Sequence, residues 1–148
     1  MENRRIESRE EVAAFLARLK YALEHGATIM FQKERRIDEA RDVRYTNQFT
    51  VAKLFQREDE KKALRRELSL LKPRNYLGTV CDTRFPHRPE MREFGVMYPN
   101  DGSFEEVYIK IRTEIMQMSG EGHFVFVMSF HFAEKPFSEM EFPYQNGG

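Results

Sequence analysis

Cysteine is scarce in this sequence, and its scarcity excludes several kinds of site. Cys81 is the only cysteine among 148 residues, so the chain can form no internal disulfide, no four-cysteine zinc site and no redox pair. A reducing compartment fits this composition. The histidines are scattered without the paired spacing of a metal site, at positions 25, 87, 123 and 131. We therefore expect no structural zinc.

Long hydrophobic runs are also missing. No stretch approaches the roughly 20 consecutive apolar residues of a membrane span. The N-terminus, MENRRIESREE, carries charges where a signal peptide has an apolar run. We expect a cytoplasmic protein without a membrane partner. A chain of 148 residues, 41% of them hydrophobic, is long enough for one core. We expect a single domain over residues 1–137 and a flexible tail over 138–148.

An excess of charge of one sign is absent from the chain as a whole, whose formal net charge is +0. Residues 1–75 nevertheless hold 18 Lys and Arg against 13 Asp and Glu, a balance of +5, and the remainder holds 6 against 11, a balance of −5. This asymmetry permits a basic face for RNA. It equally permits a charged helical surface without a partner, and on composition alone we favour that second interpretation.

The first half of the chain is predicted to be mainly helical. Ser8 and Glu11 form a capping box, and apolar residues then recur at helical spacing as far as the stop at Gly26. The short apolar run Ala27–Gln32 is a strand or a buried connection. The charged residues 33–45 form an inserted helix or a loop. Two more helices are predicted from their apolar stripes, at Thr46–Gln56 and Asp59–Leu71.

The second half is predicted to consist of strands, because aromatic and β-branched residues alternate with polar ones between Pro and Gly breaks. A proline-bearing loop, Arg84–Pro89, separates the first two strands, and the sequence SGEG supplies a hairpin turn between the last two. The predicted strands are Asn75–Cys81, Met91–Tyr98, Glu105–Ile115 and His123–Phe132.

Alternation also predicts which side chains share a face of the sheet. In the third strand, Val107, Ile109 and Ile111 alternate with Tyr108, Lys110 and Arg112. In the fourth, one face holds Phe124, Phe126, Met128, Phe130 and Phe132, and the other holds Val125, Val127, Ser129 and His131. We expect the Phe face to pack on the helices. The prediction is an α+β fold in which N-terminal helices pack on one face of a C-terminal antiparallel β-sheet, and the other face is a shallow site.

Familiar catalytic signatures are missing: the sequence has no GxSxG, P-loop, HExxH or GxGxxG motif. What remains is a group of Tyr, Lys, Arg and His on the predicted exposed face. That combination suits cleavage of RNA without a metal, in which a base takes the ribose 2′-OH proton, cations stabilise the phosphorane and an acid protonates the 5′-oxygen. The candidates are Tyr108, Lys110, Arg112 and His131.

Basic residues around the proline-bearing loop are candidates for RNA binding. Arg84, Arg88 and Arg92 could grip a nucleic-acid backbone, and Phe85 could stack on a base. An ordinary structural role stays open for each candidate, because alternating charges on a solvated sheet face and basic loops are common on proteins without such a function.

Several segments between Arg44 and Phe137 follow an order that is characteristic of one protein family. RYTNQFTVAKLF looks like an RxxNxxFLxxL segment, LSLLKPRNYLG like a helix end running into LxxxDYxxG, and REFG like an xxFG strand. EVYIKIR and VMSFHFAEKPF resemble the family's last two strands, which read like VYIKI and ISFHEAEYP. By these motifs the chain resembles the MqsR-like branch of the RelE superfamily of toxins.

The resemblance implies a RelE-like fold, ribosome-independent cleavage of messenger RNA, no metal or organic cofactor, and neutralisation by a cognate antitoxin protein. Tyr108 matches the family's strand Tyr, Lys110 its strand Lys, and His131 the basic residue after the SF pair. Tyr76 matches the tyrosine of the DY pair, and Arg92 falls near the polar position before the FG strand. Asn75 departs from the pattern, because the family has an acidic residue there.

Two functional hypotheses follow from the sequence. The first is an endoribonuclease toxin in which Tyr108 and His131 share acid and base roles while Lys110, Arg112 and Arg92 stabilise phosphate charge. The second is a non-catalytic binding module on the same scaffold, such as a phage- or mobile-element-encoded inhibitor of a protein or ribonucleoprotein complex. A structural or adaptor role is a third possibility.

Overall fold

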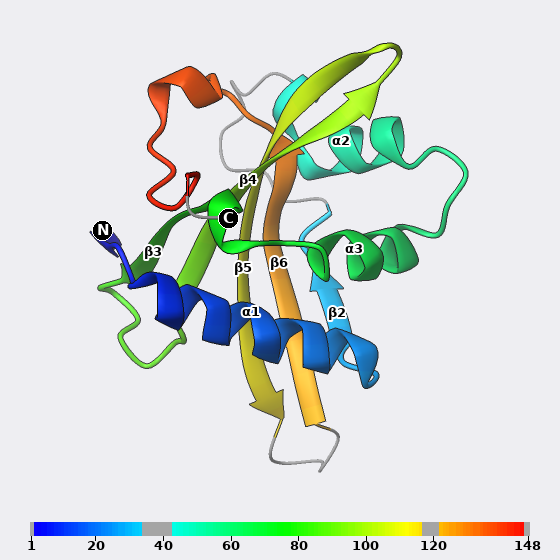
Figure 1. Cartoon of the computed structure of the whole chain (residues 1–148). Helices are drawn as coiled ribbons and strands as arrows, with labels where there is room; N and C mark the ends of the chain where they lie inside the picture. Colours follow the sequence, from blue (N-terminus) through cyan, green and yellow to red (C-terminus); the bar gives the residue numbers. More distant parts are fainter. Residues whose placement is uncertain (1, 34–42, 117–121, 147–148) are drawn as a thin grey trace.

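The computed structural model describes residues 2–33, 43–116 and 122–146. Within these ranges the chain forms an α+β fold of three α-helices and a six-stranded, mostly antiparallel sheet in the order β1-β3-β4-β5-β6-β2 (Figure 1). The helices are α1 (Arg9–Glu24), α2 (Asn47–Leu54) and α3 (Glu60–Leu68). The strands are β1 (Glu2–Arg5), β2 (Thr28–Phe31), β3 (Tyr76–Asp82), β4 (Met91–Asn100), β5 (Ser103–Met116) and β6 (Gly122–Phe132).

The two edge strands come from the N-terminal part of the chain and correct the predicted sheet. β1 pairs antiparallel with β3, and β2 pairs parallel with β6. The sheet is therefore mixed, not purely antiparallel and C-terminal. β1 was missed because four residues, ENRR, are too short and too charged to show alternation. The apolar run Ala27–Gln32, whose type the sequence left open, contains β2.

The helices begin and end close to where the sequence predicts. Ser8 caps α1 and forms the predicted capping box with Glu11, while Thr46 and Asp59 cap α2 and α3 through their side-chain oxygens. Of the predicted insertion at residues 33–45, only Lys33 and a 3₁₀ turn at Val43–Tyr45 belong to the described ranges. Most of the SGEG turn also lies outside them. No helix in the described ranges is long and apolar enough to cross a membrane.

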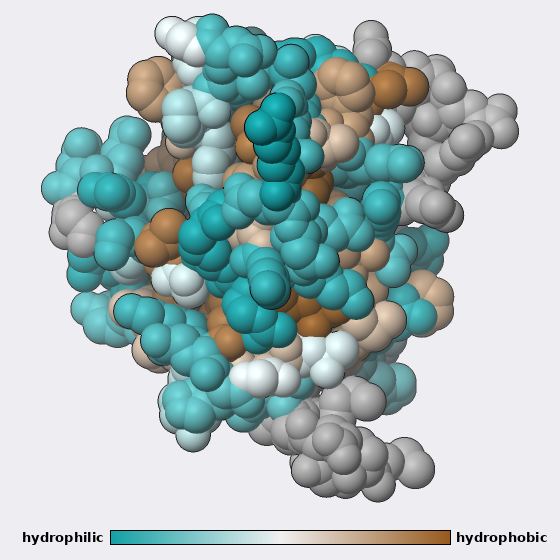
Figure 2. Space-filling model, turned by 90° about the vertical axis from the view of Figure 1, so that its right-hand side faces the viewer, coloured by the Kyte–Doolittle hydropathy of each residue, from teal (hydrophilic) through white to brown (hydrophobic). Residues whose placement is uncertain are grey.

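Helix α1 lies across one face of the sheet, which we call the α1 face (Figure 1). Phe15 of α1 stacks on Phe94 of β4, with ring centroids 6.4 Å apart. Side chains of β5 complete this core as predicted, because Val107, Ile109 and Ile111 are fully buried. The side of the molecule that carries α2 and α3 is mostly hydrophilic at its surface (Figure 2). The apolar side chains of these helices therefore point mainly inward.

A β-bulge in β6 corrects the predicted faces of that strand. Lys110 pairs with Ser129 and Ile111 with Val127, so Met128 is an extra residue between two paired positions. The insertion reverses the alternation beyond it. The α1 face consequently holds Val125, Val127, Phe130 and Phe132, all of them buried. Phe124 and Phe126 share the opposite face with Ser129 and His131. The prediction that these two residues lie on the same face as Phe130 and Phe132 is therefore wrong.

Helix α2 covers the free edge of β6 beyond the end of β2. Asn47 donates from Nδ2 to Met128 O (2.9 Å) and to Gln32 O (2.7 Å), and its Oδ1 accepts from Phe130 N (2.9 Å). Thr50 Oγ1 accepts from Phe132 N (2.9 Å). Two polar side chains of a helix thus take the place of a neighbouring strand, which satisfies backbone groups at the bulge.

The C-terminal segment, residues 133–146, folds back onto the sheet. Tyr144 stacks on Tyr76, with centroids 6.1 Å apart, and its hydroxyl donates a hydrogen bond to Glu7 O. A Cβ atom at Gly95 would lie 2.8 Å from the Phe142 ring and 2.9 Å from the Phe137 ring. The prediction of a flexible tail from residue 138 missed these contacts, which join the segment to β3 and β4.

Candidate functional site

A row of polar side chains crosses the face of the sheet opposite α1. Cross-strand pairing aligns Arg4 near Gly78, Gly78 with Glu93, Glu93 with Lys110, and Lys110 with Ser129. Arg4 forms an ion pair with Glu93 and also donates to Leu77 O (3.1 Å). Gly78 makes this possible, because a Cβ there would lie 2.6 Å from the Arg4 guanidinium.

A second cross-strand pair places Tyr108 beside His131. Their ring centroids are 5.5 Å apart, and the Tyr108 hydroxyl donates a hydrogen bond to the carboxylate of Glu93. We define the polar cluster as the five residues that these two rows bring together: Glu93, Tyr108, Lys110, Ser129 and His131. The bulge at Met128 is what turns Ser129 and His131 toward Lys110 and Tyr108 after the alternation of β6 has been interrupted.

The imidazole of His131 is oriented by the backbone. Its Nδ1 lies 2.9 Å from Phe132 O, and a carbonyl oxygen can only accept, so Nδ1 carries the hydrogen. In the neutral ring Nε2 is then the atom that accepts a proton. This tautomer leaves Nε2 as the ring nitrogen that can accept a hydrogen bond.

Burial corrects the expectation that this group lies on an exposed surface. Lys110 retains 8%, Glu93 7%, His131 5% and Ser129 1% of its accessible surface, and only Tyr108 among the five is half-exposed. A lysine at this level of exposure is uncommon unless it is paired. The cluster is therefore a desolvated polar site rather than a shallow solvated one.

Arg112 shares the face of the polar cluster, one alternate position beyond Lys110. Its guanidinium carbon lies 4.4 Å from the centroid of the Phe126 ring, on the paired position of β6. Residues two apart on a strand are about 7 Å apart, so Arg112 is the neighbour of Lys110 on this face. The contact with Phe126 holds its guanidinium there. Tyr108, Lys110 and Arg112 thus lie at alternate positions on one face of β5, and His131 contacts Tyr108 from β6.

Arg92 and Tyr76 do not join them, because both face α1. Arg92 forms a bidentate ion pair with Glu7 (2.8 and 3.1 Å) and lies over the Phe15 ring. Tyr76 is completely buried, and its hydroxyl is hydrogen-bonded with Thr79 Oγ1 (2.6 Å). Arg92 was predicted to stabilise phosphate charge together with Lys110 and Arg112. Its side chain instead forms an ion pair with Glu7 on the α1 face, the face opposite to those two residues. Alternation with Phe94 and Val96 on β4 already indicated this face.

The ion pair with Arg92 also affects the ionisation of Glu7. Burial raises the pKa of the Glu7 carboxyl, but hydrogen bonds from Arg92 and Thr79, with the charges of Arg92 and Arg5, outweigh burial and lower the pKa below its usual 4.5. The carboxylate stays ionised near neutral pH. It ties the segment before α1 to β3 and β4.

The remaining predicted residues lie on the β3–β4 loop. Arg84 forms an ion pair with Asp82 (3.0 Å), which lowers the pKa of the Asp82 carboxyl to about 2. Arg88 lies over the Phe85 ring, 4.0 Å from its centroid. Both arginines are exposed, so this loop presents cations to solvent, separately from the polar cluster.

Glu93 and Arg4 were missed by the sequence analysis. Glu93 could have been found, because it alternates with the apolar positions of β4 and therefore faces away from them. Arg4 gave no signal, because the pairing of β1 was not predicted. Among the residues that the structure describes, no group of three or more His, Cys, Asp and Glu side chains could hold a metal ion. A base, cations and a hydroxyl acid are the chemistry that the cluster offers.

Comparisons of the chain with protein-family models, with curated proteins and with solved structures found no match.

Proposed function

We propose that this protein is a metal-independent endoribonuclease that cleaves messenger RNA in the cytoplasm, as the toxin of a toxin–antitoxin pair on an MqsR-like, RelE-like fold. The observation that carries the proposal is that Tyr108, Lys110, Arg112 and His131 share one face of β5 and β6, with Tyr108 and His131 in contact. RNA is the substrate and a cognate antitoxin protein is the partner. The resemblance in motifs supports the same reaction.

The reaction is an internal transfer of the phosphodiester. His131 Nε2 takes the proton of the ribose 2′-OH, O2′ forms a bond to phosphorus, and the bond between phosphorus and O5′ breaks. Tyr108 donates its hydroxyl proton to O5′. Lys110 and Arg112 stabilise the negative charge of the phosphorane. The products are a 2′,3′-cyclic phosphate and a 5′-hydroxyl, and the proton returns from His131 to Tyr108 through water.

Removing one hydroxyl tests this assignment. Tyr108→Phe keeps the ring against His131 but removes the acid, so we expect cleavage to slow by about 100-fold or more. Tyr21→Phe, an exposed tyrosine on α1, is the matched control and should cleave at the wild-type rate. The measurement is the initial rate on a labelled mixed-sequence RNA. Equal rates for Tyr108→Phe and wild type would remove Tyr108 from the mechanism.

Growth on expression tests the toxin assignment. Wild-type protein should arrest growth of a bacterial host that lacks an antitoxin, and a Lys110→Ala, His131→Ala double variant, expressed to the same level and folded, should not. Arrest by both proteins would place the toxicity elsewhere than in the polar cluster.

The burial of Lys110 and His131 favours a second candidate function, a non-catalytic binding module that inhibits a protein or ribonucleoprotein complex. In that case the polar cluster stabilises the sheet, because a buried cation that is paired needs no substrate. This candidate predicts an inactive wild type on every RNA tested, together with loss of stability rather than of cleavage when Lys110 is replaced.

A further inference from the structure

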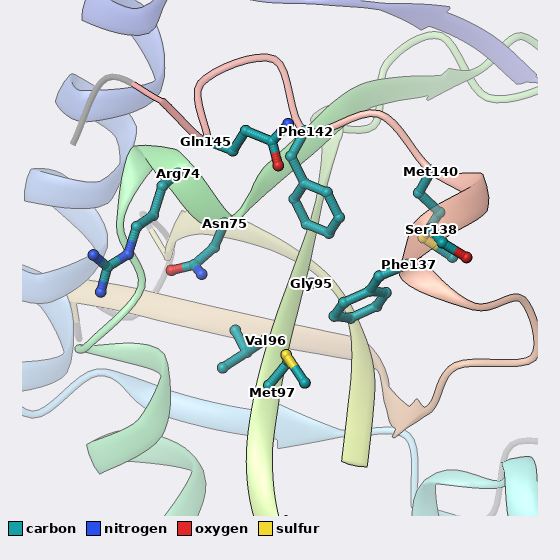
Figure 3. A pocket seen from close by; sticks show the side chains of 10 residues that line it. All are labelled: Arg74, Asn75, Gly95, Val96, Met97, Phe137, Ser138, Met140, Phe142 and Gln145. Carbon is teal, nitrogen blue, oxygen red and sulfur yellow. The ribbon is translucent and has the colours of Figure 1, made fainter. Parts of the chain in front are cut away.

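A pocket of about 650 Å³ opens next to the polar cluster. It lies between β4, the 3₁₀ turn Pro73–Asn75 and the C-terminal segment (Figure 3). A volume of this size falls within the range of about 300–1,000 Å³ that small-molecule sites occupy. The residues around it are Arg74, Asn75, Gly95, Val96, Met97, Phe137, Ser138, Met140, Phe142 and Gln145.

The pocket and the polar cluster meet at Gly95. Gly95 pairs directly with Tyr108, and directly paired residues of an antiparallel sheet have side chains on the same face, about 5 Å apart. The Phe137 and Phe142 rings lie over Gly95, where a Cβ atom would clash with both. The pocket wall at Gly95 is therefore the direct cross-strand neighbour of Tyr108.

The lining of the pocket suits an unpaired nucleotide. Phe142 and Phe137 are half-buried and contact each other edge to face, with centroids 5.2 Å apart, so each ring has surface for stacking. Asn75 and Gln145 contribute amides, and Figure 3 shows Gln145 beside Phe142 and Asn75 beside Arg74, on the side of the 3₁₀ turn. The amide of Asn75 is held in place by Lys72 N, which donates to Oδ1 (2.9 Å). Arg74 adds an exposed cation at the rim.

Each of these groups recognises a different part of a nucleotide. Aromatic rings stack on bases, amides hydrogen-bond with base edges, and arginine binds phosphate. The geometry points to a subsite for one unpaired RNA base, next to the scissile phosphate, that gives the cleavage reaction its base preference. This inference rests on the proposed function for the position of the cut, but base binding itself does not need cleavage.

The test separates binding from cleavage. Hexanucleotides with 2′-O-methyl groups cannot be cleaved through O2′, so they report on binding alone. In a titration followed through methionine methyl resonances, Met97 and Met140 should shift, and Met30, which is exposed on β2 at the far edge of the sheet, should not. Phe142→Leu should weaken binding by about tenfold, whereas Tyr21→Leu, on the α1 side of the sheet, should not weaken it.

Cleavage mapping on natural RNA completes the test. With an active wild type, Phe142→Leu and Arg74→Ala should flatten the base preference at the nucleotide beside the cut, while Arg18→Ala, an exposed arginine of α1, preserves it. Absent shifts of Met97 and Met140, with an unchanged preference in Phe142→Leu, would overturn the subsite and leave the nuclease standing. Shifts with an inactive wild type would overturn the nuclease and support the subsite.

Discussion

Single buried charges hold the N-terminal segment in place. Glu7 is 3% exposed and accepts hydrogen bonds from Arg92 and from Thr79 Oγ1 (2.6 Å). Removing Glu7 would leave the Arg92 guanidinium without its partner away from solvent. The resulting loss of stability is larger than the loss from breaking an ion pair on the surface. On the opposite face the buried charge is the carboxylate of Glu93, which pairs with the exposed Arg4 and accepts a hydrogen bond from the Tyr108 hydroxyl.

Replacing Glu7 by Gln should destabilise the protein at neutral pH by about 2–4 kcal/mol, because Arg92 loses its partner. The folded-state pKa of Glu7 lies below 4.5, so its contribution is present above pH 4.5 and is lost as the pH falls through the folded pKa. Urea unfolding should therefore show a large difference between wild type and Glu7→Gln at pH 7 that narrows toward pH 3. Glu10→Gln, exposed on α1, should change little at either pH.

At the scale of elements, the bulge in β6 decides the site. Without the extra residue, His131 would face α1 and Phe130 would face Tyr108. The alternation in β5 predicted its two faces correctly, because that strand has no irregularity up to Lys110. The predicted faces of β6 were wrong because the bulge depends on partners outside the strand. These are the side chain of Asn47, which bonds to the backbone of β6, and the paired strand β5, and no pattern within β6 reveals either of them.

Asn47 should therefore be critical for the β6 edge. Asn47→Ala leaves three backbone partners, Gln32 O, Met128 O and Phe130 N, without this side chain, so we expect a loss of about 3 kcal/mol in the free energy of unfolding. Gln48→Ala, the exposed neighbour in α2, should lose less than about 0.5 kcal/mol. Equal urea midpoints for the two variants would mean that the edge contacts contribute nothing.

The C-terminal segment is the other element that the sequence analysis did not place. Its aromatic residues lie at irregular intervals between prolines and charged residues, so the segment shows no helical or strand periodicity. Their partners, Gly95 and Tyr76, lie on other strands and are apparent only once the sheet is assembled. Short-range patterns thus predicted the helices, the main strands and the alternation of β5, but not long-range packing onto a glycine.

Gly95→Ala tests how this segment is held. The added Cβ would lie within 2.9 Å of the Phe137 and Phe142 rings, which must shift, so the segment should open more often. Limited proteolysis should then cut between residues 133 and 146 faster in the variant than in wild type. Ser138→Ala, an exposed change in the same segment, serves as the control. An unchanged rate in Gly95→Ala would show that the rings adjust without releasing the segment.

For the whole molecule, a formal net charge of +0 means that RNA binding cannot rely on a general positive field. RNA binding at the proposed site instead needs a few local phosphate contacts, from Lys110, Arg112 and Arg74. Each phosphate contact on a single strand contributes a slope of about −0.7 to log K against log salt concentration. We expect a slope near −2 for a 2′-O-methyl RNA, reduced by about 0.7 in Arg74→Ala and unchanged in Arg18→Ala. A slope near zero for wild type would exclude these phosphate contacts.

The central claim is that the polar cluster cleaves RNA, and the chemistry of the product ends tests it most directly. Purified wild type should cut a mixed-sequence RNA in EDTA and leave 2′,3′-cyclic phosphate ends, and a folded Lys110→Ala, His131→Ala double variant should leave the RNA intact. Intact RNA with folded wild type, or identical cutting by the double variant, would contradict the account.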